Sequence, residues 1–273
     1  MKIRDILNNK EYKESRIILS YIKSMGYSKL LTVSDQELSD EEMDEFLRIQ
    51  SKLKDNYPLQ YAIGKWNFFG YDFKVTEDVL IPRPETEILV EMILKNNLHG
   101  KRILDIGTGS GAIALTIDLE SRKKGQIPCV TAVDISEEAI KIAKYNAENL
   151  GANVDFIQSD LFEKVEEKYD IIVSNPPYIT EKDYKGLEKE LFYEPKLALV
   201  GGVKGYEIYD RIIESAKSKM NEKAMIVFEI GYDQGEIVSD ILKKNGFFNV
   251  KVFKDFNKID RIVLAYVQEV KNV

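Results

Sequence analysis

From about residue 87 onward, the chain alternates short apolar runs with longer segments of mixed polarity. The apolar runs are rich in Ile, Val and Leu, as buried strands are, and segments of helical length such as 137–150 separate them. This alternation is typical of a parallel sheet with helices on both faces, because each parallel strand needs a long crossover to reach the next. We therefore predict an α/β domain with strands at residues 102–106, 130–134, 154–157, 169–174 and 224–230.

The C-terminal part departs from this alternation. Residues 250–253 and 262–266 are two further apolar runs with only a short connection between them. Because that connection is too short for a parallel crossover, we predict that these two strands pair antiparallel.

The first part of the chain has helical patterns instead. Apolar residues recur at helical spacing over 18–25, and Gly26 then predicts the end of a helix. Ser39 and Glu42 have the spacing of a capping box at the start of another helix. Aromatic residues interspersed with glycines over 66–73 predict a β-hairpin. We therefore expect a helical domain over 1–60, a hairpin linker over 61–86 and the α/β domain over 87–273.

Composition limits the partners and the kind of site. The net charge of −7 argues against a nucleic-acid backbone as the main partner, and we expect no direct role for nucleic acid. The single cysteine, Cys129, is expected to be buried in a strand, and the single histidine, His99, to lie at a helix end. One cysteine excludes a cysteine-rich metal site, and we expect no metal.

Targeting signals are also missing from the pattern. No segment approaches the ~20 apolar residues of a transmembrane helix, and the first ten residues contain no apolar run of signal-peptide length. We expect a soluble cytoplasmic protein with no membrane partner.

A glycine-rich loop follows the first predicted strand and precedes a helix. It contains Gly107, Gly109 and Gly111, with Thr108 and Ser110 between them. Glycines allow a tight turn and a close approach of a ligand to the backbone. In this position the loop predicts an adenosine-containing cofactor, either a nicotinamide dinucleotide or S-adenosylmethionine.

Two carboxylates and two apolar side chains extend this prediction. Asp134 ends the second predicted strand, where it would accept hydrogen bonds from ribose hydroxyls. Asp160 follows the third predicted strand and would reach the adenine amino group, while Leu161 or Phe162 would pack on the adenine face. Both cofactors carry this adenosine, so these residues do not choose between them.

Four residues decide between the two cofactors: Asn175, Pro176, Pro177 and Tyr178. They follow the fourth predicted strand, at the sheet edge where α/β proteins bind ligands. The Asn175 side-chain carbonyl and the Pro176 backbone carbonyl are acceptors that the prolines hold rigidly, and they suit the two donors of one planar NH2 group. Tyr178 offers a face for packing against that group. Orienting an amide nitrogen toward a sulfonium methyl can supply roughly 7–11 kcal/mol of barrier reduction, without a histidine base. The motif therefore predicts an S-adenosylmethionine-dependent methyltransferase.

Further motifs accompany these: Tyr57-Pro-Leu-Gln-Tyr-Ala-Ile-Gly, Leu80-Ile-Pro-Arg-Pro-Glu-Thr-Glu, Val133-Asp134, Tyr193-Glu-Pro-Lys-Leu-Ala-Leu, Phe228-Glu-Ile-Gly and Asp260-Arg261. With the glycine loop and Asn175-Pro-Pro-Tyr, they make most of the chain resemble the release factor glutamine methyltransferases of the HemK/PrmC family. The resemblance implies a class I methyltransferase fold, Rossmann-like, with a seven-stranded mostly parallel sheet and an antiparallel C-terminal hairpin. It also implies a preceding helical domain that binds the substrate and a β-hairpin linker.

The resemblance further implies an activity. The family transfers a methyl group from S-adenosyl-L-methionine to N5 of the glutamine in the Gly-Gly-Gln loop of class I peptide chain release factors, and releases S-adenosyl-L-homocysteine. By that similarity, residues 107–111, Asp134 and Asn175 contact the cofactor or the reacting centre, and Asn175 with Pro176 holds the glutamine amide.

Other residues have pocket roles by the same similarity. Arg83, Pro84, Glu194 and Pro195 would shape the substrate pocket. Leu161 stands where some members carry an aromatic residue, and residues 257–258 stand where we expect a glycine, so the adenine contact and that turn are expected to differ.

Three alternatives share parts of this pattern. A glutamine methyltransferase acting on a ribosomal protein would have the same loop and motif. A nucleic-acid adenine-N6 methyltransferase would present the same NH2 group on an extruded base, although the acidic charge balance disfavours it. A non-catalytic factor-binding module would not need the intact Asn175-Pro-Pro-Tyr.

Overall fold

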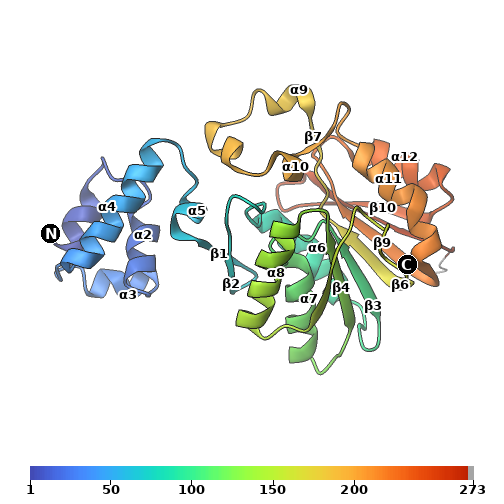
Figure 1. The fold of residues 1–273 in the computed structure, drawn as a ribbon, viewed down its shortest axis with the longest axis horizontal. Helices are drawn as coiled ribbons and strands as arrows, with labels where there is room; N and C mark the ends of the chain where they lie inside the picture. The colour runs from blue at the N-terminus through green and yellow to red at the C-terminus, as the bar shows by residue number, and fades with distance from the viewer. Residues whose placement is uncertain (270–273) are drawn as a thin grey trace. The chain divides into compact units, whose positions relative to one another are not determined.

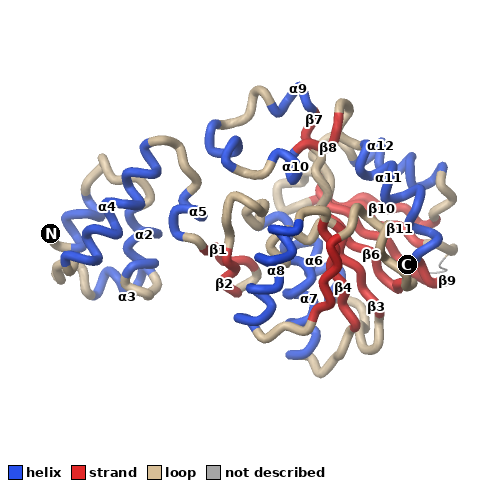
Figure 2. Tube along the Cα trace, in the orientation of Figure 1, coloured by secondary structure: helices blue, strands red, loops and turns tan. Residues whose placement is uncertain are grey.

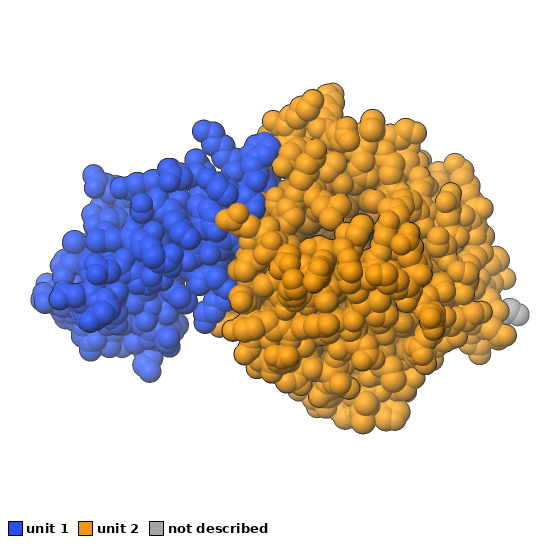
Figure 3. All heavy atoms as spheres, in the orientation of Figure 1, with its two compact units in different colours: residues 1–65, 188–193 blue, residues 66–187, 194–273 orange. Residues whose placement is uncertain are grey.

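The computed structural model describes residues 1–269; residues 270–273, the end of the predicted 87–273 domain, lie outside the described part. Residues 1–269 form two compact units, which Figure 3 colours separately. Unit 1 contains residues 1–65 and 188–193, and unit 2 contains residues 66–187 and the chain from 194 onward.

Unit 2 carries the elements of the predicted α/β domain and the hairpin (Figures 1 and 2). Their bounds are β1 (Lys65–Phe68, with its first residue in unit 1), β2 (Tyr71–Lys74), α6 (Pro84–Leu94), β3 (Arg102–Ile106), α7 (Ala112–Lys123), β4 (Cys129–Asp134), α8 (Glu137–Leu150), β5 (Val154–Gln158), β6 (Tyr169–Ser174), β7 (Ile179–Thr180), α9 (Glu181–Tyr184), α10 (Lys196–Leu199), β8 (Val200–Gly202), α11 (Glu207–Ala216), the 3-10 turn η2 (Lys217–Lys219), β9 (Met220–Glu229), α12 (Gly235–Lys244), β10 (Phe248–Lys254) and β11 (Asp260–Tyr266).

Within the described residues, unit 2 is built on a seven-stranded sheet in the order β10-β11-β9-β6-β3-β4-β5. Strands β9, β6, β3, β4 and β5 run parallel. Strand β11 pairs antiparallel with both β9 and β10. The predicted parallel sheet and the antiparallel C-terminal pair are therefore confirmed.

Two cores lie on opposite faces of this sheet, because successive residues of a strand point to opposite sides. One core takes Ile226 and Phe228 from β9 and is covered by α11 and α12. The other takes Met225 and Val227 from the same strand and is covered by α6 and α7. The near-continuous apolar runs of the sequence reflect this burial on both faces.

The predicted hairpin is formed by β1 and β2, and a buried side chain of α8 links its last residue to the glycine loop. Asn146 of α8 accepts a hydrogen bond from the Lys74 N–H (2.8 Å) and donates to the Lys74 carbonyl (3.1 Å). The same amide donates to the Ser110 carbonyl in the glycine loop at 2.9 Å. A single carboxamide thus completes the backbone hydrogen bonding of the hairpin's last residue and of the glycine loop.

Unit 1 is helical, as predicted. Its elements are α1 (Ile3–Asn8), α2 (Ser15–Ile22), α3 (Tyr27–Thr32), α4 (Asp40–Lys54), α5 (Leu59–Ile63) and the 3-10 turn η1 (Lys189–Tyr193). The capping box of α4 is confirmed: the Glu42 N–H donates to the Ser39 hydroxyl, and the Ser39 N–H donates to the Glu42 carboxylate.

Segment 188–193 joins unit 1 although it is distant in sequence. The Tyr193 hydroxyl donates to the Asp55 carbonyl at 3.1 Å, and its ring packs edge-on against Tyr57 at 5.0 Å. The sequence pattern did not indicate this excursion, because its six residues carry no periodicity of their own.

Two local predictions were wrong. Helix α2 ends at Ile22, and the left-handed residue after it is Ser24; Gly26 instead precedes α3 with an extended backbone. Cys129 is exposed rather than buried, since it begins β4 at the end of the sheet where the strand emerges from its neighbours.

No helix within residues 1–269 has the length and apolarity to cross a membrane.

Asn146→Leu should lower the free energy of unfolding by about 3 kcal/mol, because it leaves the Lys74 and Ser110 backbone groups without partners in a buried place. Urea denaturation measures this. The matched control is Asn149→Leu on the exposed face of the same helix, whose amide meets only the Tyr145 carbonyl and whose loss should cost under about 0.5 kcal/mol. Equal costs for the two variants would contradict the role given to Asn146.

Candidate functional site

A cavity lies at the carboxyl edge of the sheet in unit 2. The segments that follow β3, β4, β5 and β6 all contribute to its wall. Among the residues predicted for the site, the cavity is lined by Gly107, Gly109, Asp134, Asp160, Leu161, Asn175, Pro176, Pro177 and Pro195. The parallel register brings them together, since carboxyl ends of parallel strands share one edge.

The glycine loop forms one wall of this cavity. Gly107, Gly109 and Gly111 all have positive φ, which glycine adopts without steric cost. A Cβ at Gly107 or Gly109 would meet no atom within 4 Å, so the backbone there is bare toward open space. Gly111 caps α7. Thr108 and Ser110 are buried beneath the loop rather than lining the cavity.

A buried carboxyl group supports the loop from below. Asp105 is fully buried at the end of β3, and its Oδ2 accepts a hydrogen bond from the Thr108 hydroxyl at 2.6 Å. Burial raises the pKa of Asp105 to about 7. The sequence analysis did not single out Asp105, although it stands two residues before Gly107.

Asp134 ends β4 and lies against the glycine loop at the cavity wall. One carboxylate oxygen accepts the Gly109 N–H at 2.9 Å, and the other accepts the Ser136 N–H at 2.9 Å. Burial raises the pKa of Asp134, and these backbone donors act in the opposite direction. A carboxylate oxygen has room for more than one donor, so Asp134 keeps capacity to accept from a ligand hydroxyl.

The segment after β5 provides another part of the wall. Asp160 forms an ion pair of 2.8 Å with Arg211 of α11, and both residues line the cavity. Leu161 lines it as well and has a left-handed backbone with φ of 47°. Phe162 is instead buried in the core beneath α11.

Asn175, Pro176 and Pro177 follow β6 directly and line the cavity beside the glycine loop. The Asn175 carboxamide nitrogen donates to the Thr86 hydroxyl at 3.2 Å. Its carboxamide oxygen therefore lies on the opposite side of the amide. Tyr178 is not among the lining residues, and burial raises the pKa of its hydroxyl to about 12.

Two glycines and a glutamine fix the backbone of this motif. A Cβ at Gly201 would stand 2.3 Å from the Pro177 carbonyl oxygen, and one at Gly205 would stand 2.6 Å from the Tyr178 carbonyl oxygen. The buried Gln234 amide donates to the Tyr178 carbonyl at 3.1 Å and to the Gly205 carbonyl at 3.0 Å. The sequence analysis missed this support; the adjacent glycines 201–202 were the available signal.

An ion pair supports the remaining predicted pocket residues. Glu194 is buried and accepts hydrogen bonds from the Arg83 guanidinium (2.5 Å) and the Ile81 N–H (3.1 Å). None of Arg83, Pro84 and Glu194 lines the cavity, and Pro84 is exposed at the first position of α6. Their neighbours Leu80 and Pro195 do line it, so the pair shapes the wall from behind.

The sequence analysis missed a further group of lining residues. They come from the segment after β2 and from α8, α10 and α11: Asp78, Val79, Leu80, Ala139, Leu197, Ala198, Ile208, Arg211 and Ile212. The length of the segment between two strands identified α8 as a helix but could not show which of its residues faces a cavity.

Among residues 1–269, no group of three or more His, Cys, Asp and Glu side chains is placed to hold a metal ion. His99 is exposed ahead of β3, at the end of the sheet opposite to the cavity. The prediction that it lies at a helix end was wrong, because α6 already ends at Leu94.

Known proteins share both the sequence and the fold. The methyltransferase small domain model matches residues 84–223, and the PrmC N-terminal domain model matches residues 4–64. The release factor glutamine methyltransferase of Bacillus subtilis is 43% identical over 273 aligned residues, which cover 96% of this chain and 93% of that protein. The chain belongs to the release factor glutamine methyltransferase family.

Solved structures show the fold more widely. A methyltransferase from Pyrococcus furiosus has a TM-score of 0.55 at 20% identity, over 84% of this chain and 99% of that one. The E. cuniculi Mtq2-Trm112 complex, responsible for methylation of the eRF1 translation termination factor, has a TM-score of 0.50 at 18% identity, over 70% and 99% of the two chains. Together they show the class I methyltransferase fold that the sequence predicted.

The cofactor of this family is S-adenosylmethionine, and the cavity fits it. The bare backbone at Gly107 and Gly109 leaves room for a close approach, and Asp134 offers acceptor oxygens beside it. Leu161 and Ile212 supply apolar wall, and Asp160 lines the same cavity with its charge partly balanced by Arg211.

Gly201→Ala should lower the free energy of unfolding by about 2 kcal/mol, because the added methyl would collide with the Pro177 carbonyl. Urea denaturation again provides the measurement. Gly186→Ala is the control: its Cβ would lie 3.5 Å from the Asp183 carbonyl oxygen, an ordinary contact, and its cost should stay under about 0.5 kcal/mol. A stable Gly201→Ala protein would contradict the close packing described for this segment.

Proposed function

We propose that this chain transfers a methyl group from S-adenosyl-L-methionine to the side-chain amide nitrogen of the glutamine in the Gly-Gly-Gln loop of peptide chain release factors. The observation that carries the proposal is the position of Asn175 and Pro176. They line one cavity with the glycine loop, so a planar amide held by their oxygens would lie beside the cofactor.

The cofactor roles follow from the geometry of the loop. Residues 107–111 and Asp134 would hold S-adenosylmethionine, with Gly107 and Gly109 giving backbone access and Asp134 accepting from the ribose. Asp160 and Leu161 would contact the adenine. When bound, this cofactor supplies an electrophilic methyl group on a positively charged sulfur.

The substrate roles fall to the chain's own acceptors. Asn175 Oδ1 and the Pro176 carbonyl would each accept one N–H of the glutamine amide, which orients the nitrogen and concentrates electron density on it. Arg83, Pro84, Glu194 and Pro195 would shape the entry by supporting the adjoining wall. Tyr178 does not line the cavity, so we propose that it supports the motif from behind, where Gln234 holds its carbonyl.

The proton released from nitrogen needs no strong base beforehand. A Tyr178 hydroxyl with a pKa of about 12 stays neutral at physiological pH, and His99 is exposed ahead of β3. The site instead acts by holding and orienting the amide, which fits the absence of a general base in the motif that the sequence analysis identified.

We also propose a role for each part of the chain and a cellular location for the reaction. The helical segment 1–60 would bind the release factor, the hairpin 61–86 would link it to the methyltransferase domain, and no nucleic acid or membrane would be required. We place the reaction in the cytoplasm, where release factors work.

The test is transfer of labelled methyl from S-adenosylmethionine to a purified release factor, compared with a factor whose loop glutamine is replaced by alanine. Label on the first and none on the second supports both reaction and target. Label on neither, with the cofactor still bound, would redirect the search to a ribosomal protein and then to nucleic acid.

Asn175→Ala should reduce kcat by about 100-fold or more, because one of the two acceptors that orient the amide is removed. Cofactor affinity, measured by calorimetry, should remain close to that of the unmodified chain. Asn149→Ala, an exposed asparagine on α8, is the control and should keep full activity. Undiminished transfer in Asn175→Ala would remove the proposed role of this side chain.

A further inference from the structure

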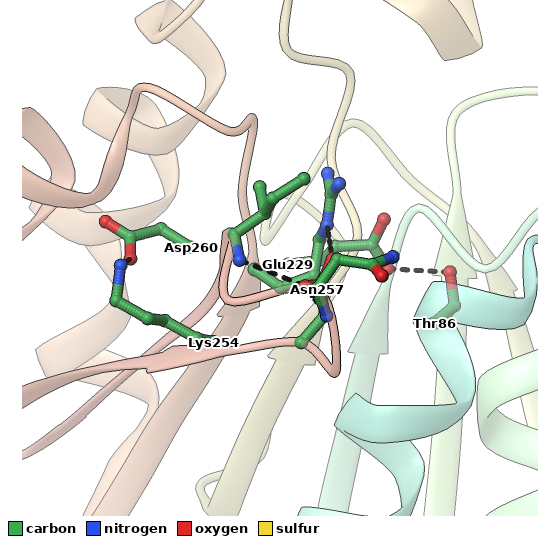
Figure 4. Close-up of polar contacts among 8 residues, drawn as sticks. Thr86, Glu229, Lys254, Asn257 and Asp260 are labelled. Carbon is green, nitrogen blue, oxygen red and sulfur yellow. Dashed lines mark hydrogen bonds and ion pairs between the residues drawn. The ribbon is translucent and has the colours of Figure 1, made fainter.

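Behind Asn175 lies a short chain of buried polar groups. The Thr86 hydroxyl, on α6, donates to Glu229 Oε2 at 2.6 Å, and the Asn175 carboxamide nitrogen donates to the same hydroxyl at 3.2 Å. Figure 4 draws Thr86 and Glu229, with the bond from the Thr86 hydroxyl as a dashed line. Thr86 is 4% exposed and Glu229 2% exposed, so water does not compete for these bonds.

The number of protons available to these groups fixes the direction of both hydrogen bonds. A carboxylate only accepts hydrogen bonds, and a hydroxyl carries one proton and two lone pairs. Because the Thr86 proton is given to Glu229, the Thr86 oxygen can only accept from Asn175. Asn175 must therefore turn its NH2 toward Thr86 and its oxygen toward the cavity.

The direction matters because the two ends of an amide are nearly equal in size. Packing alone discriminates poorly between the two orientations of an asparagine amide, and the hydrogen-bond network decides between them. In the reversed orientation, Asn175 would present an NH2 to the cavity. A substrate NH2 would then meet a donor rather than an acceptor, and its amide would lose one of its two fixed partners.

We propose that Glu229 and Thr86 are positioning residues that fix the carboxamide orientation of Asn175 and thereby select a substrate group that donates two N–H bonds. The proposal rests on the function proposed above. Glu229 acts through two other side chains and does not itself line the cavity. Its backbone is held in register by β11, where it pairs with Ile262, and its carbonyl accepts the Tyr209 hydroxyl at 2.8 Å.

The test compares three single variants for kcat, KM and cofactor affinity on a release factor. Glu229→Gln keeps size and shape but introduces donors, so the bond direction can reverse. Thr86→Val keeps shape and removes the hydroxyl, whereas Thr86→Ser keeps the hydroxyl. We expect kcat to fall by about 100-fold in the first two, as expected for a misoriented reacting group. Cofactor affinity should be unaffected, and Thr86→Ser should recover most of the activity.

The double variant Thr86→Val with Glu229→Gln distinguishes two possibilities. Either Glu229 acts on Asn175 through Thr86, which we call the relay, or the two residues act independently. If Glu229 acts through Thr86, the double variant should be no slower than Thr86→Val alone, because interacting residues are non-additive. Multiplied losses, or full activity in Glu229→Gln, would overturn the proposal. The unmodified chain is assayed in parallel. If the proposed function is wrong, that chain transfers no methyl group. If only the relay is wrong, the unmodified chain is active and the variants keep their activity.

A pH profile adds a readout that a purely structural role would not change. Burial raises the pKa of Glu229 to about 7, with Thr86 and Arg261 acting to lower it. The other charged or titratable groups around it are Arg83, Glu85, Tyr178 and Tyr209. The raised pKa means that the carboxylate predominates above about pH 7, so kcat should fall as pH drops through about 7. That step should disappear in Thr86→Val, and its persistence there would contradict the relay.

Discussion

The parallel pairing of β3 with its two neighbours is the constraint on which the site depends. Ile106 at the end of β3 stands in register with Val133 of β4 on one side and with Ser174 of β6 on the other. The Ser174 hydroxyl also donates to the Ile106 carbonyl at 2.6 Å, which locks the strand ends together. The next residues of these strands are the glycine loop, Asp134 and Asn175. Their proximity is thus a property of the sheet rather than of the loops themselves.

Rigidity at this edge comes from groups that never reach the cavity. Gln234 holds two backbone carbonyls, Glu194 holds the segment before α6, and Asp105 holds the base of the glycine loop. Each is buried, and each uses its polar atoms on backbone or side-chain partners close to a lining residue. The lining residues are consequently placed by a layer of hydrogen bonds behind them, which is how a site can keep a fixed geometry without bulky packing.

The sequence predicted those parts of this arrangement that depend on local pattern. The strands of the sheet, the antiparallel end and the capping box at Ser39 follow from periodicity and turn chemistry, and the structure contains them. The relation of Thr86 to Glu229 joins residues 143 positions apart, which only the folded sheet brings together. Cys129 was misjudged for a similar reason, because its strand pattern does not show where the neighbouring strands end. At Lys258, where the family resemblance had suggested a glycine, the backbone still adopts the left-handed conformation with φ of 64°.

Asn146 has a consequence for ligand affinity. It joins α8, the end of the hairpin and the glycine loop through one carboxamide, across separations of 72 and 36 residues. The conformational entropy of the loop is therefore lost when the domain folds, before any ligand arrives. Ligand binding therefore costs less conformational entropy, which is the physical meaning of a preorganised site. By thermodynamic linkage, a change that loosens the hairpin lowers the affinity of the loop for its ligand. Conversely, a bound ligand stabilises the attachment of the hairpin.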